Sequence, residues 1–195
     1  MENIIITGHK NPDTDSICSA LSYTWIKGQL GEKVTACRAG NVNPETRFVL
    51  DYWKVDAPAL VEKVEEGQKI ILVDHNEMSQ AVDGLDKADL VEIIDHHRLA
   101  DIQTGTPIYV RNEPVGSSAT IVADMYQEKG LMPTAKMAGL MAAAIVSDTV
   151  MFKSPTCTQR DIDIANRMAR IANVSLEDLG KTVFSASVSD DKSAE

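Results

Sequence analysis

Short apolar runs alternate with longer amphipathic stretches along most of the chain. The runs are rich in β-branched residues and are bounded by turn-forming or charged residues, a pattern typical of buried strands. They occupy residues 3–7, 33–39, 69–74, 89–95 and 107–111. The last run is the most polar of the five, which favours a place near an edge of the sheet. Residues 58–61 are predicted to form a further short extended piece.

Apolar residues recur at helical spacing between and after these runs. The spacing predicts helices at residues 16–29, 44–53, 119–129, 135–146, 158–172 and 175–185. Ser16 or Asp15 is the predicted N-cap of the first helix, and Asn43 and Thr134 are predicted to cap two later ones. The alternation predicts a doubly wound α/β fold, with a mainly parallel five-stranded sheet, helices on both faces and a helical C-terminal part.

The composition limits the classes of function. A hydrophobic content of 44% and a charged content of 25% in 195 residues are typical of a globular chain with one core. The formal net charge of −10 disfavours a large nucleic-acid footprint, which needs clustered Lys and Arg. No apolar run reaches the roughly 18 residues of a membrane span, and the N-terminus has no signal-peptide layout. The three cysteines form no metal-type pair, so we expect reduced thiols in a cytoplasmic protein.

Acidic residues and histidines follow three of the predicted strands and lie late in one Ala-rich helix. They are His9, Asp13 and Asp15 after the first strand, Asp74 and His75 at the end of the third, Asp95, His96 and His97 at the end of the fourth, and Asp148 in the helix. All four histidines of the chain belong to this set. Because the carboxyl ends of parallel strands meet at one edge of a sheet, these side chains are expected to converge.

Each of these residues alone has an ordinary structural explanation, such as a helix cap or a polar strand end. Together, four or five carboxylates at one edge would repel strongly, and bound cations would relieve that repulsion. Asp13, Asp15, Asp74 and Asp148 carry four negative charges, which two divalent ions would neutralise. Oxygen and imidazole ligands without a thiolate favour Mn²⁺, and next Mg²⁺ or Co²⁺, over a structural zinc. Two ions about 3.5–4 Å apart can activate a water and bind phosphoryl oxygens.

Five motifs carry a resemblance to a known family. They are Gly-His-Lys-Asn-Pro-Asp-Thr-Asp-Ser at 8–16, Asp-His-Asn-Glu at 74–77, Asp-His-His at 95–97, Gly-Ser-Ser-Ala-Thr at 116–120 and Ser-Asp-Thr at 147–149. In this order and spacing, the chain resembles the family II inorganic pyrophosphatases of the Asp-His-His phosphoesterase superfamily, up to about Ser185. The Asp-His-His triplet is shared across that superfamily, whereas the first motif is much more specific.

The resemblance implies a role for each matched position. His9 and Asp13 would hold a first metal ion, and Asp15, His96 and Asp148 a second, with Asp74 bridging the two. His97 would face the substrate or its leaving oxygen, and Asp95 and His75 would orient the ligands; the implied catalytic set is His97, Asp74 and Asp95. The implied cofactors are two Mn²⁺ per chain, with Co²⁺ or Mg²⁺ as alternatives, and additional Mg²⁺ that enters with pyrophosphate. A water between the metal ions would attack one phosphorus in line.

The chain departs from the family pattern in one respect. Family members carry a second, C-terminal domain with a Ser-Arg-Lys-Lys-Gln segment that binds the phosphates, and this sequence contains no such segment. We therefore expect a phosphoesterase domain at 1–186 and the start of a linker or tail at 187–195, without the substrate-binding domain. A domain of this kind would bind Mn²⁺ but hydrolyse pyrophosphate slowly. The resemblance also implies a homodimer, for which the fifth strand at 107–112 is a candidate edge.

The sequence is also compatible with three alternatives. The first is a phosphodiesterase of the same superfamily that acts on short oligonucleotides or a cyclic dinucleotide. The second is an exopolyphosphatase of related architecture. The third is a non-catalytic module that binds metal ions and mediates dimerisation.

Overall fold

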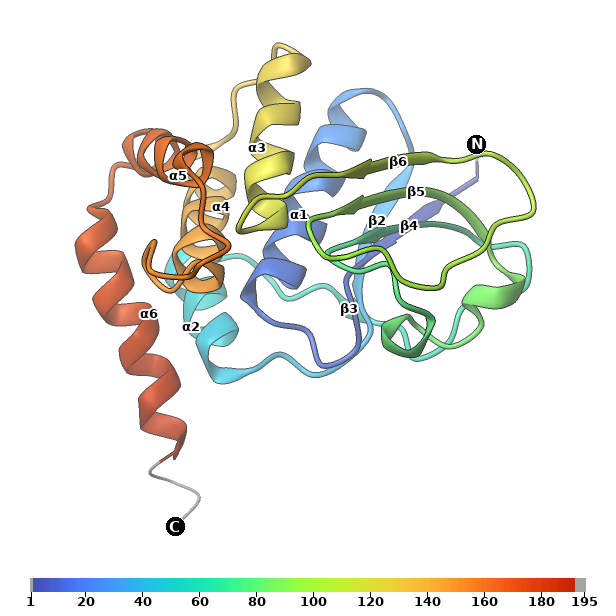
Figure 1. The fold of residues 1–195 in the computed structure, drawn as a ribbon, viewed down its shortest axis with the longest axis horizontal. Helices are drawn as coiled ribbons and strands as arrows, with labels where there is room; N and C mark the ends of the chain where they lie inside the picture. The colour runs from blue at the N-terminus through green and yellow to red at the C-terminus, as the bar shows by residue number, and fades with distance from the viewer. Residues whose placement is uncertain (1, 192–195) are drawn as a thin grey trace.

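A six-stranded parallel sheet forms the frame of the molecule (Figure 1). The computed structural model describes residues 2–191. The strands are β1 (Ile4–Thr7), β2 (Val34–Arg38), β3 (Ala59–Leu60), β4 (Lys69–Val73), β5 (Asp89–Asp95) and β6 (Tyr109–Asn112). Their order in the sheet is β3-β2-β1-β4-β5-β6, and every neighbouring pair is parallel. The order reverses between β1 and β4, so the carboxyl ends of these strands border the crevice where open α/β sheets bind ligands.

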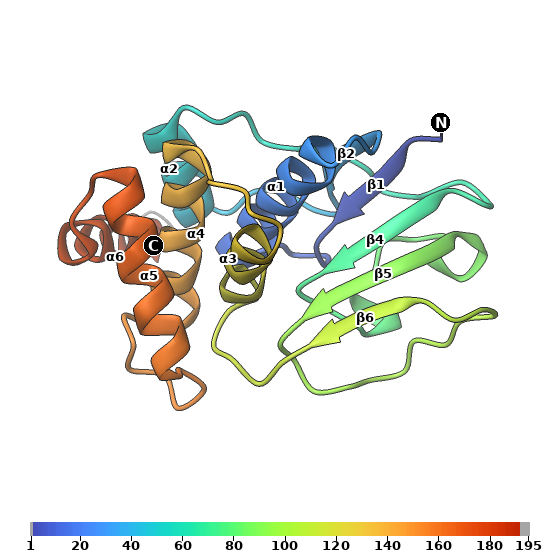
Figure 2. The ribbon, with the colours of Figure 1, turned by 90° about the horizontal axis from the view of Figure 1, so that it is seen from above.

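Helices cover one face of the sheet in two layers (Figure 2). They are α1 (Thr14–Gln29), α2 (Pro44–Trp53), α3 (Ser118–Glu128), α4 (Ala135–Asp148), α5 (Gln159–Ala172) and α6 (Leu176–Asp191). Helices α1 and α3 pack on the sheet, and α4 packs against both of them. The outer helices α2, α5 and α6 then pack on α4. This second layer brings the end of α4 close to the strand ends, although α4 is remote from them in sequence.

The sheet is buried on both faces, as parallel sheets generally are. Ile71 and Val73 pack into the large core under the helices, whereas Ile70 and Leu72 pack into a smaller core on the opposite face. That smaller core is covered by loops and by two 3₁₀ helices, η1 (Met78–Gln80) and η2 (Leu85–Lys87), rather than by the α-helices predicted there. Met78, Ala81, Val82 and Leu85 have helical spacing, but the backbone is extended at Ala81 and left-handed at Gly84, with φ of 89°, so the segment forms two short 3₁₀ turns instead of one α-helix.

The predicted strands and helices are confirmed, with differences at their ends. The short extended piece predicted at 58–61 contains β3, which pairs with β2 and adds one strand to the five that were predicted. Strand β6 lies at an edge of the sheet, as predicted. The N-cap of α1 is Asp13, whose Oδ1 accepts from the Ser16 amide at 2.8 Å, so the predicted cap at Ser16 or Asp15 is wrong. Asp15 lies inside the first turn of α1, and its carboxylate accepts hydrogen bonds from the N-terminus of α3 instead.

The last helix is longer than the sequence pattern indicates. Helix α6 continues to Asp191, and the chain after residue 175 contains no proline that would end it earlier. The first part of the predicted linker or tail at 187–195 is therefore helical, and residues 192–195 lie outside the described residues. Cys18, Cys37 and Cys157 are free thiols, in agreement with the prediction. Among residues 2–191, we find no helix with the length and apolar content needed to cross a membrane.

Two glycines test how tightly α4 packs against α2. A Cβ on Gly139 of α4 would lie 2.1 Å from Cε2 of the Trp53 ring, whereas a Cβ on Gly28 of α1 would meet nothing within 4 Å. Gly139→Ala should lower the free energy of unfolding by about 1–3 kcal/mol, since the helices must separate. Gly28→Ala should raise it by about 0.5–1 kcal/mol, through lower chain entropy in the unfolded state. Urea unfolding of both variants measures the difference, and equal effects would contradict the close helix contact.

Candidate metal centre

Asp74 lies at the centre of the convergence predicted from the sequence. It directly follows β4, its side chain is 1% exposed, and its backbone takes a left-handed conformation with φ of 63°. Such a conformation is costly for a non-glycine residue and is retained where the surrounding structure requires it. The Asp74 amide donates to the Ile94 carbonyl at 2.8 Å, which fixes this turn against the end of β5.

The two oxygens of Asp74 serve two clusters. Asp74 Oδ2 lies 3.4 Å from His9 Nε2, which is also 3.7 Å from Asp13 Oδ1. Asp74 Oδ1 lies 3.2 Å from His96 Nε2. His96 Nε2 is in turn 3.1 Å from Asp148 Oδ2 and 3.6 Å from Asp15 Oδ2. The potential ligand atoms of each cluster lie within 4.8 Å of one another. All six residues named as metal ligands are thus brought together, in two groups that share Asp74.

Both histidines are held by backbone carbonyls. His9 Nδ1 lies 2.7 Å from the Lys10 carbonyl, and His96 Nδ1 lies 2.9 Å from the Val115 carbonyl. A carbonyl can only accept, so Nδ1 carries the proton in each ring and Nε2 faces the carboxylates. This arrangement fixes the tautomer and the ring orientation that a metal-binding histidine needs.

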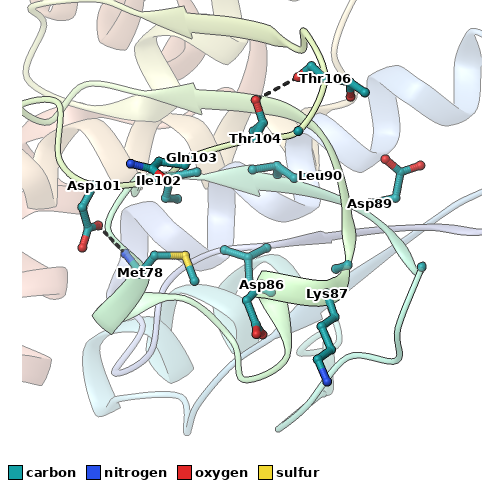
Figure 3. A pocket seen from close by; sticks show the side chains of 14 residues that line it. Met78, Asp86, Lys87, Asp89, Leu90, Asp101, Ile102, Gln103, Thr104 and Thr106 are labelled. Atoms are coloured by element: carbon teal, nitrogen blue, oxygen red, sulfur yellow. Dashed lines mark hydrogen bonds between the residues drawn. The ribbon is translucent and has the colours of Figure 1, made fainter.

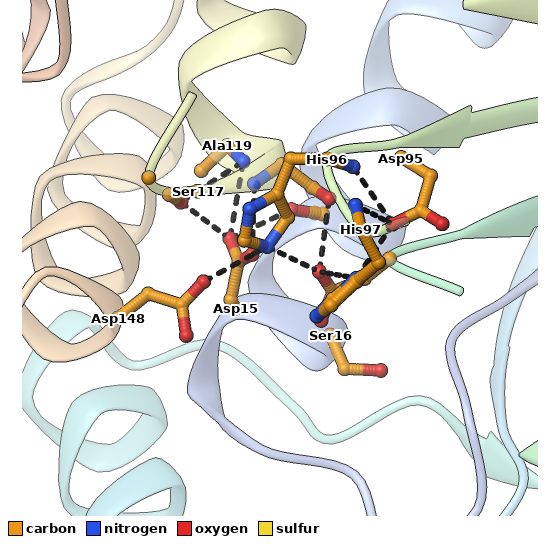
Figure 4. A network of polar contacts seen from close by, with 12 residues as sticks. Asp15, Ser16, Asp95, His96, His97, Ser117, Ala119 and Asp148 are labelled. Atoms are coloured by element: carbon orange, nitrogen blue, oxygen red, sulfur yellow. Dashed lines mark hydrogen bonds and ion pairs between the residues drawn. The ribbon is translucent and has the colours of Figure 1, made fainter. Parts of the chain in front are cut away.

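The N-terminus of α3 binds the Asp15 carboxylate (Figure 4). Asp15 Oδ1 accepts from the Ser117 hydroxyl at 2.6 Å and from the Ala119 amide at 3.0 Å. Asp15 Oδ2 accepts from the Ser118 amide at 2.8 Å, and the Ser118 hydroxyl donates to Asp74 Oδ1 at 2.9 Å. The helix dipole and the free amides of a first turn favour an anion here. The Gly-Ser-Ser motif is evident in the sequence, but its role as a donor to Asp15 is not predicted there; a serine N-cap directly after a glycine is the signal that could have indicated it.

Asp161 is a second residue that sequence reasoning missed. It is fully buried and caps α5 in a reciprocal box with Thr158. Its Oδ2 accepts from the Gly116 amide at 2.9 Å, and its Oδ1 accepts from the Thr120 hydroxyl at 2.6 Å. A Cβ on Gly116 would lie 2.7 Å from Cγ2 of Thr149, so only glycine fits at this point. Asp161 therefore anchors the loop that carries the donors to Asp15.

Asp95 orients the two histidines that follow it. Its Oδ1 accepts from the amide of His96 at 2.7 Å and from Nδ1 of His97 at 2.7 Å. Its Oδ2 accepts from the Asn76 side chain at 2.6 Å. The His97 side chain is 51% exposed, so this ring lies at the edge of the centre and is partly in contact with solvent. His75 donates from Nδ1 to the Val73 carbonyl at 2.8 Å and meets the His9 ring edge-on, at 6.0 Å between centroids.

Without a bound cation, the two histidines carry the positive charge of the centre. Burial alone would lower the pKa of His9, but Asp13 and Asp74 raise it to about 11. Burial likewise opposes the shift of His96, yet Asp148 and Asp74 raise its pKa to about 12. Despite its burial, Asp74 has a pKa well below its usual range, because both histidines face it. Each imidazolium thus lies among carboxylates, where a metal ion would neutralise the same charges.

Asp15 and Asp148 experience the opposite effect, since their pKa values are raised. Burial, together with the charges of Asp74 and Asp148, raises the pKa of Asp15 well above its usual value. Burial also raises the pKa of Asp148, against the effect of His96. By contrast, burial lowers the pKa of His75 to about 4, so that ring is neutral. The centre therefore holds more negative charge than two imidazolium ions can fully stabilise.

Several atoms of the centre have a geometry that suits cations better than hydrogen bonds. Asp74 Oδ2, His96 Nε2 and Asp148 Oδ2 are buried without a hydrogen-bond partner among the described residues. They are close enough for ion pairs but are not aligned as donors and acceptors. Ligands about 2.0–2.2 Å from one metal ion are separated by about 3.0–3.5 Å, close to the separations found here. The donor set also lacks sulfur, which favours Mn²⁺, Mg²⁺ or Co²⁺ over structural zinc.

A cavity of about 590 Å³ is not part of this centre (Figure 3). It lies at the opposite end of the sheet, where β5 begins, between η2 and residues 101–106. Its lining includes Asp86, Asp89 and Asp101, but no histidine, and Asp101 already accepts from the Met78 amide at 2.9 Å. A smaller cavity of about 170 Å³ adjoins the centre and is lined in part by His75, His97 and Arg98.

The fold and the paired clusters are what a divalent-metal site would need, and comparison with known proteins gives the family of the chain. Residues 3–145 match the model of the DHH family, N-terminal domain, so the chain belongs to this family. It is 53% identical over 190 residues to a probable manganese-dependent inorganic pyrophosphatase of Clostridium acetobutylicum, covering 97% of this chain and 61% of the relative. It is 49% identical over 186 residues to the manganese-dependent inorganic pyrophosphatase of Methanothrix thermoacetophila, covering 95% and 60%.

A solved structure agrees with these relatives. The crystal structure of a Methanococcus jannaschii protein assigned to the family II inorganic pyrophosphatases superposes with a TM-score of 0.87 at 40% sequence identity. The match covers 94% of this chain and 61% of that one. The recognition of this family from the five motifs is therefore confirmed. The chain spans about three fifths of the length of the proteins it matches.

The raised pKa values of His9 and His96 generate a prediction about cation binding. Both rings are protonated at pH 7–9 without a cation, so a metal ion must displace their protons. Binding of Mn²⁺ should release about two protons per chain, and the apparent affinity should rise with pH by about tenfold per unit for each proton. Calorimetric titrations in buffers of different ionisation enthalpy measure this number. His9→Ala should release about one proton fewer, and identical heats in all buffers would refute the expectation.

Proposed function

We propose that the chain is the metal-binding N-terminal part of a manganese-dependent inorganic pyrophosphatase, which converts diphosphate and water to two phosphates. The observation that carries the proposal is the pair of clusters that share Asp74, one oxygen to each. In this proposal His9, Asp13 and Asp74 hold one Mn²⁺, and Asp15, Asp74, His96 and Asp148 hold the other. The names and high identity of the relatives support the same activity.

The residues of the proposed centre would have separate roles in hydrolysis. Two bound Mn²⁺ ions would activate a water and stabilise charge on the phosphoryl oxygens. His97 would donate a proton from Nε2 to the leaving phosphate. The hydrogen bond from His97 Nδ1 to Asp95 fixes the ring and raises the pKa of His97, which favours the protonated form that a proton donor needs. The cavity beside His97 and Arg98 offers space for the substrate. Additional Mg²⁺ would enter with pyrophosphate, as the family resemblance implies.

The proposal includes a domain division and a cellular location. Residues 1–186 would form the phosphoesterase domain, and a segment that binds the phosphates with basic residues would belong to a second domain. Because such electrostatic stabilisation is usually a large part of catalysis, the chain by itself should turn over slowly. Its three free thiols suit the cytoplasm, and fractionation of cells that express the gene would test that location.

The activity is tested with the purified chain, Mn²⁺ and three substrates. Phosphate release from pyrophosphate should exceed release from polyphosphate or from a dinucleotide, and should be far slower than for a relative of full length. Asp74→Asn should lower it by more than about 100-fold, since loss of outer groups alone costs 10–100-fold in metal sites. Asp86→Asn, an exposed change in η2, should leave the rate unchanged.

Other outcomes discriminate between the alternatives. Faster hydrolysis of the dinucleotide would favour the phosphodiesterase, and faster hydrolysis of polyphosphate the exopolyphosphatase. Mn²⁺ binding without any hydrolysis would favour a non-catalytic module. A rate that Asp74→Asn does not change would refute the assigned centre.

We also propose that the chain forms a homodimer through β6. This strand lies at an edge of the sheet, and Tyr109 and Val110 are each 48% exposed. An exposed edge strand offers unpaired backbone groups to a second copy.

Sedimentation of the chain should give a mass twice the 21.2 kDa of one chain. Val110→Lys should give monomers, whereas Met132→Lys, an exposed change between α3 and α4, should not; a monomeric unmodified chain would exclude the dimer.

A further inference from the structure

Glu45 connects three elements that surround the metal centre. It lies in the first turn of α2, outside the set of proposed ligands. Its Oε1 accepts from the Thr14 hydroxyl at 2.6 Å and also from the Ser147 hydroxyl. Its Oε2 accepts from the Ser187 hydroxyl at 2.9 Å. One carboxylate thus joins the start of α1, the end of α4 and the last turns of α6.

Two of these partners are neighbours of proposed metal ligands. Thr14 lies between Asp13 and Asp15 at the start of α1, and Ser147 directly precedes Asp148 at the end of α4. Thr14 is fully buried, so its hydroxyl has few alternatives to this contact and to Thr46. Because both hydroxyls donate to the same carboxylate oxygen, their helix ends are held at a fixed separation. Asp15 and Asp148 both belong to the second cluster, so this separation sets the opening of that site.

The third partner lies on the last helix of the described chain. Helix α6 packs against both α2 and α4. A Cβ on Gly180 of α6 would lie 3.0 Å from Sδ of Met151, so α6 also passes close to the turn after Asp148. In that turn Val150, Met151 and Phe152 all have positive φ, a conformation that non-glycine residues rarely keep unless neighbouring structure holds it. The position of α6 is therefore linked to the end of α4 from two sides.

We infer that Glu45 is a positioning residue, which fixes the spacing of Asp15 and Asp148 and links it through Ser187 to the position of α6. The inference rests on the proposed metal centre and adds a residue that does not itself contact the cations. Loss of the Glu45 carboxylate should weaken cation binding at the second cluster most. Asp15 and Asp148 both belong to that cluster, and the helix ends that carry them are both bonded to Glu45. The first cluster, built on His9 and Asp13, should change less.

The test is a titration of the full chain with Mn²⁺, with free Mn²⁺ followed by electron paramagnetic resonance. Glu45→Ala should weaken one of the two binding steps by about tenfold, the lower end of the 10–100-fold effects seen for groups outside the ligands. It should also alter the spectrum of the coupled ion pair, which depends on ion spacing. Glu45→Gln keeps one acceptor oxygen, which can still accept from both Thr14 and Ser147, and should restore part of the affinity. Glu66→Ala, an exposed change before β4, is the matched control and should alter neither step.

Ser187→Ala isolates the link to α6 with little risk to folding. It should weaken the same binding step by a smaller factor, whereas Ser185→Ala, which removes a hydroxyl bonded only within α6, should not. Two normal binding steps and an unchanged spectrum in Glu45→Ala would overturn the inference. So would equal weakening of both steps with a matching loss of thermal stability, which indicates general destabilisation. If the unmodified chain fails to bind two Mn²⁺, the proposed centre itself is refuted, and the positioning role with it.

Discussion

The burial of several carboxylates at one edge of a parallel sheet is the constraint on which the site depends. Asp15 and Asp74 are each about 1% exposed, and an ionised carboxylate in such surroundings is costly unless it is paired or bound to a cation. The fold meets part of this cost with donors, through the α3 N-terminus and the Ser117 and Ser118 hydroxyls. Positive charge must supply the rest, from protonated histidines or from divalent cations in their place.

The architecture explains why these groups meet. The strand order reverses between β1 and β4, so the segments after β1, β4 and β5 border one crevice. The second helical layer then brings Asp148 to the same crevice from the end of α4. Asp161 holds the loop of donors, Asp95 holds the histidine pair, and Glu45 joins the helix ends. Asp161, Asp95 and Glu45 are not among the proposed ligands, but their hydrogen bonds help to fix the positions of the residues that are.

The sequence predicted the elements and the convergence because both depend on local patterns and on one rule of parallel sheets. Strand ends that carry acids and histidines must meet, so His9, Asp74 and His96 could be placed together without coordinates. The supporting residues could not be predicted in this way. Asp161 and Glu45 are remote in sequence from the groups they bind, and their role depends on how α5 and α2 pack. The prediction for the N-cap of α1 is wrong because Asp13 and Asp15 are equally good caps by residue type, and only the tertiary contacts of Asp15 distinguish them.

The central claim is that two divalent cations hold the clustered side chains together. Anomalous scattering at the manganese edge, from crystals grown with Mn²⁺, tests it most directly. We predict two peaks about 3.5–4 Å apart, one beside His9 and one beside His96, with Asp74 between them. A single peak, or peaks away from Asp74, would contradict the shared carboxylate on which the proposed chemistry depends.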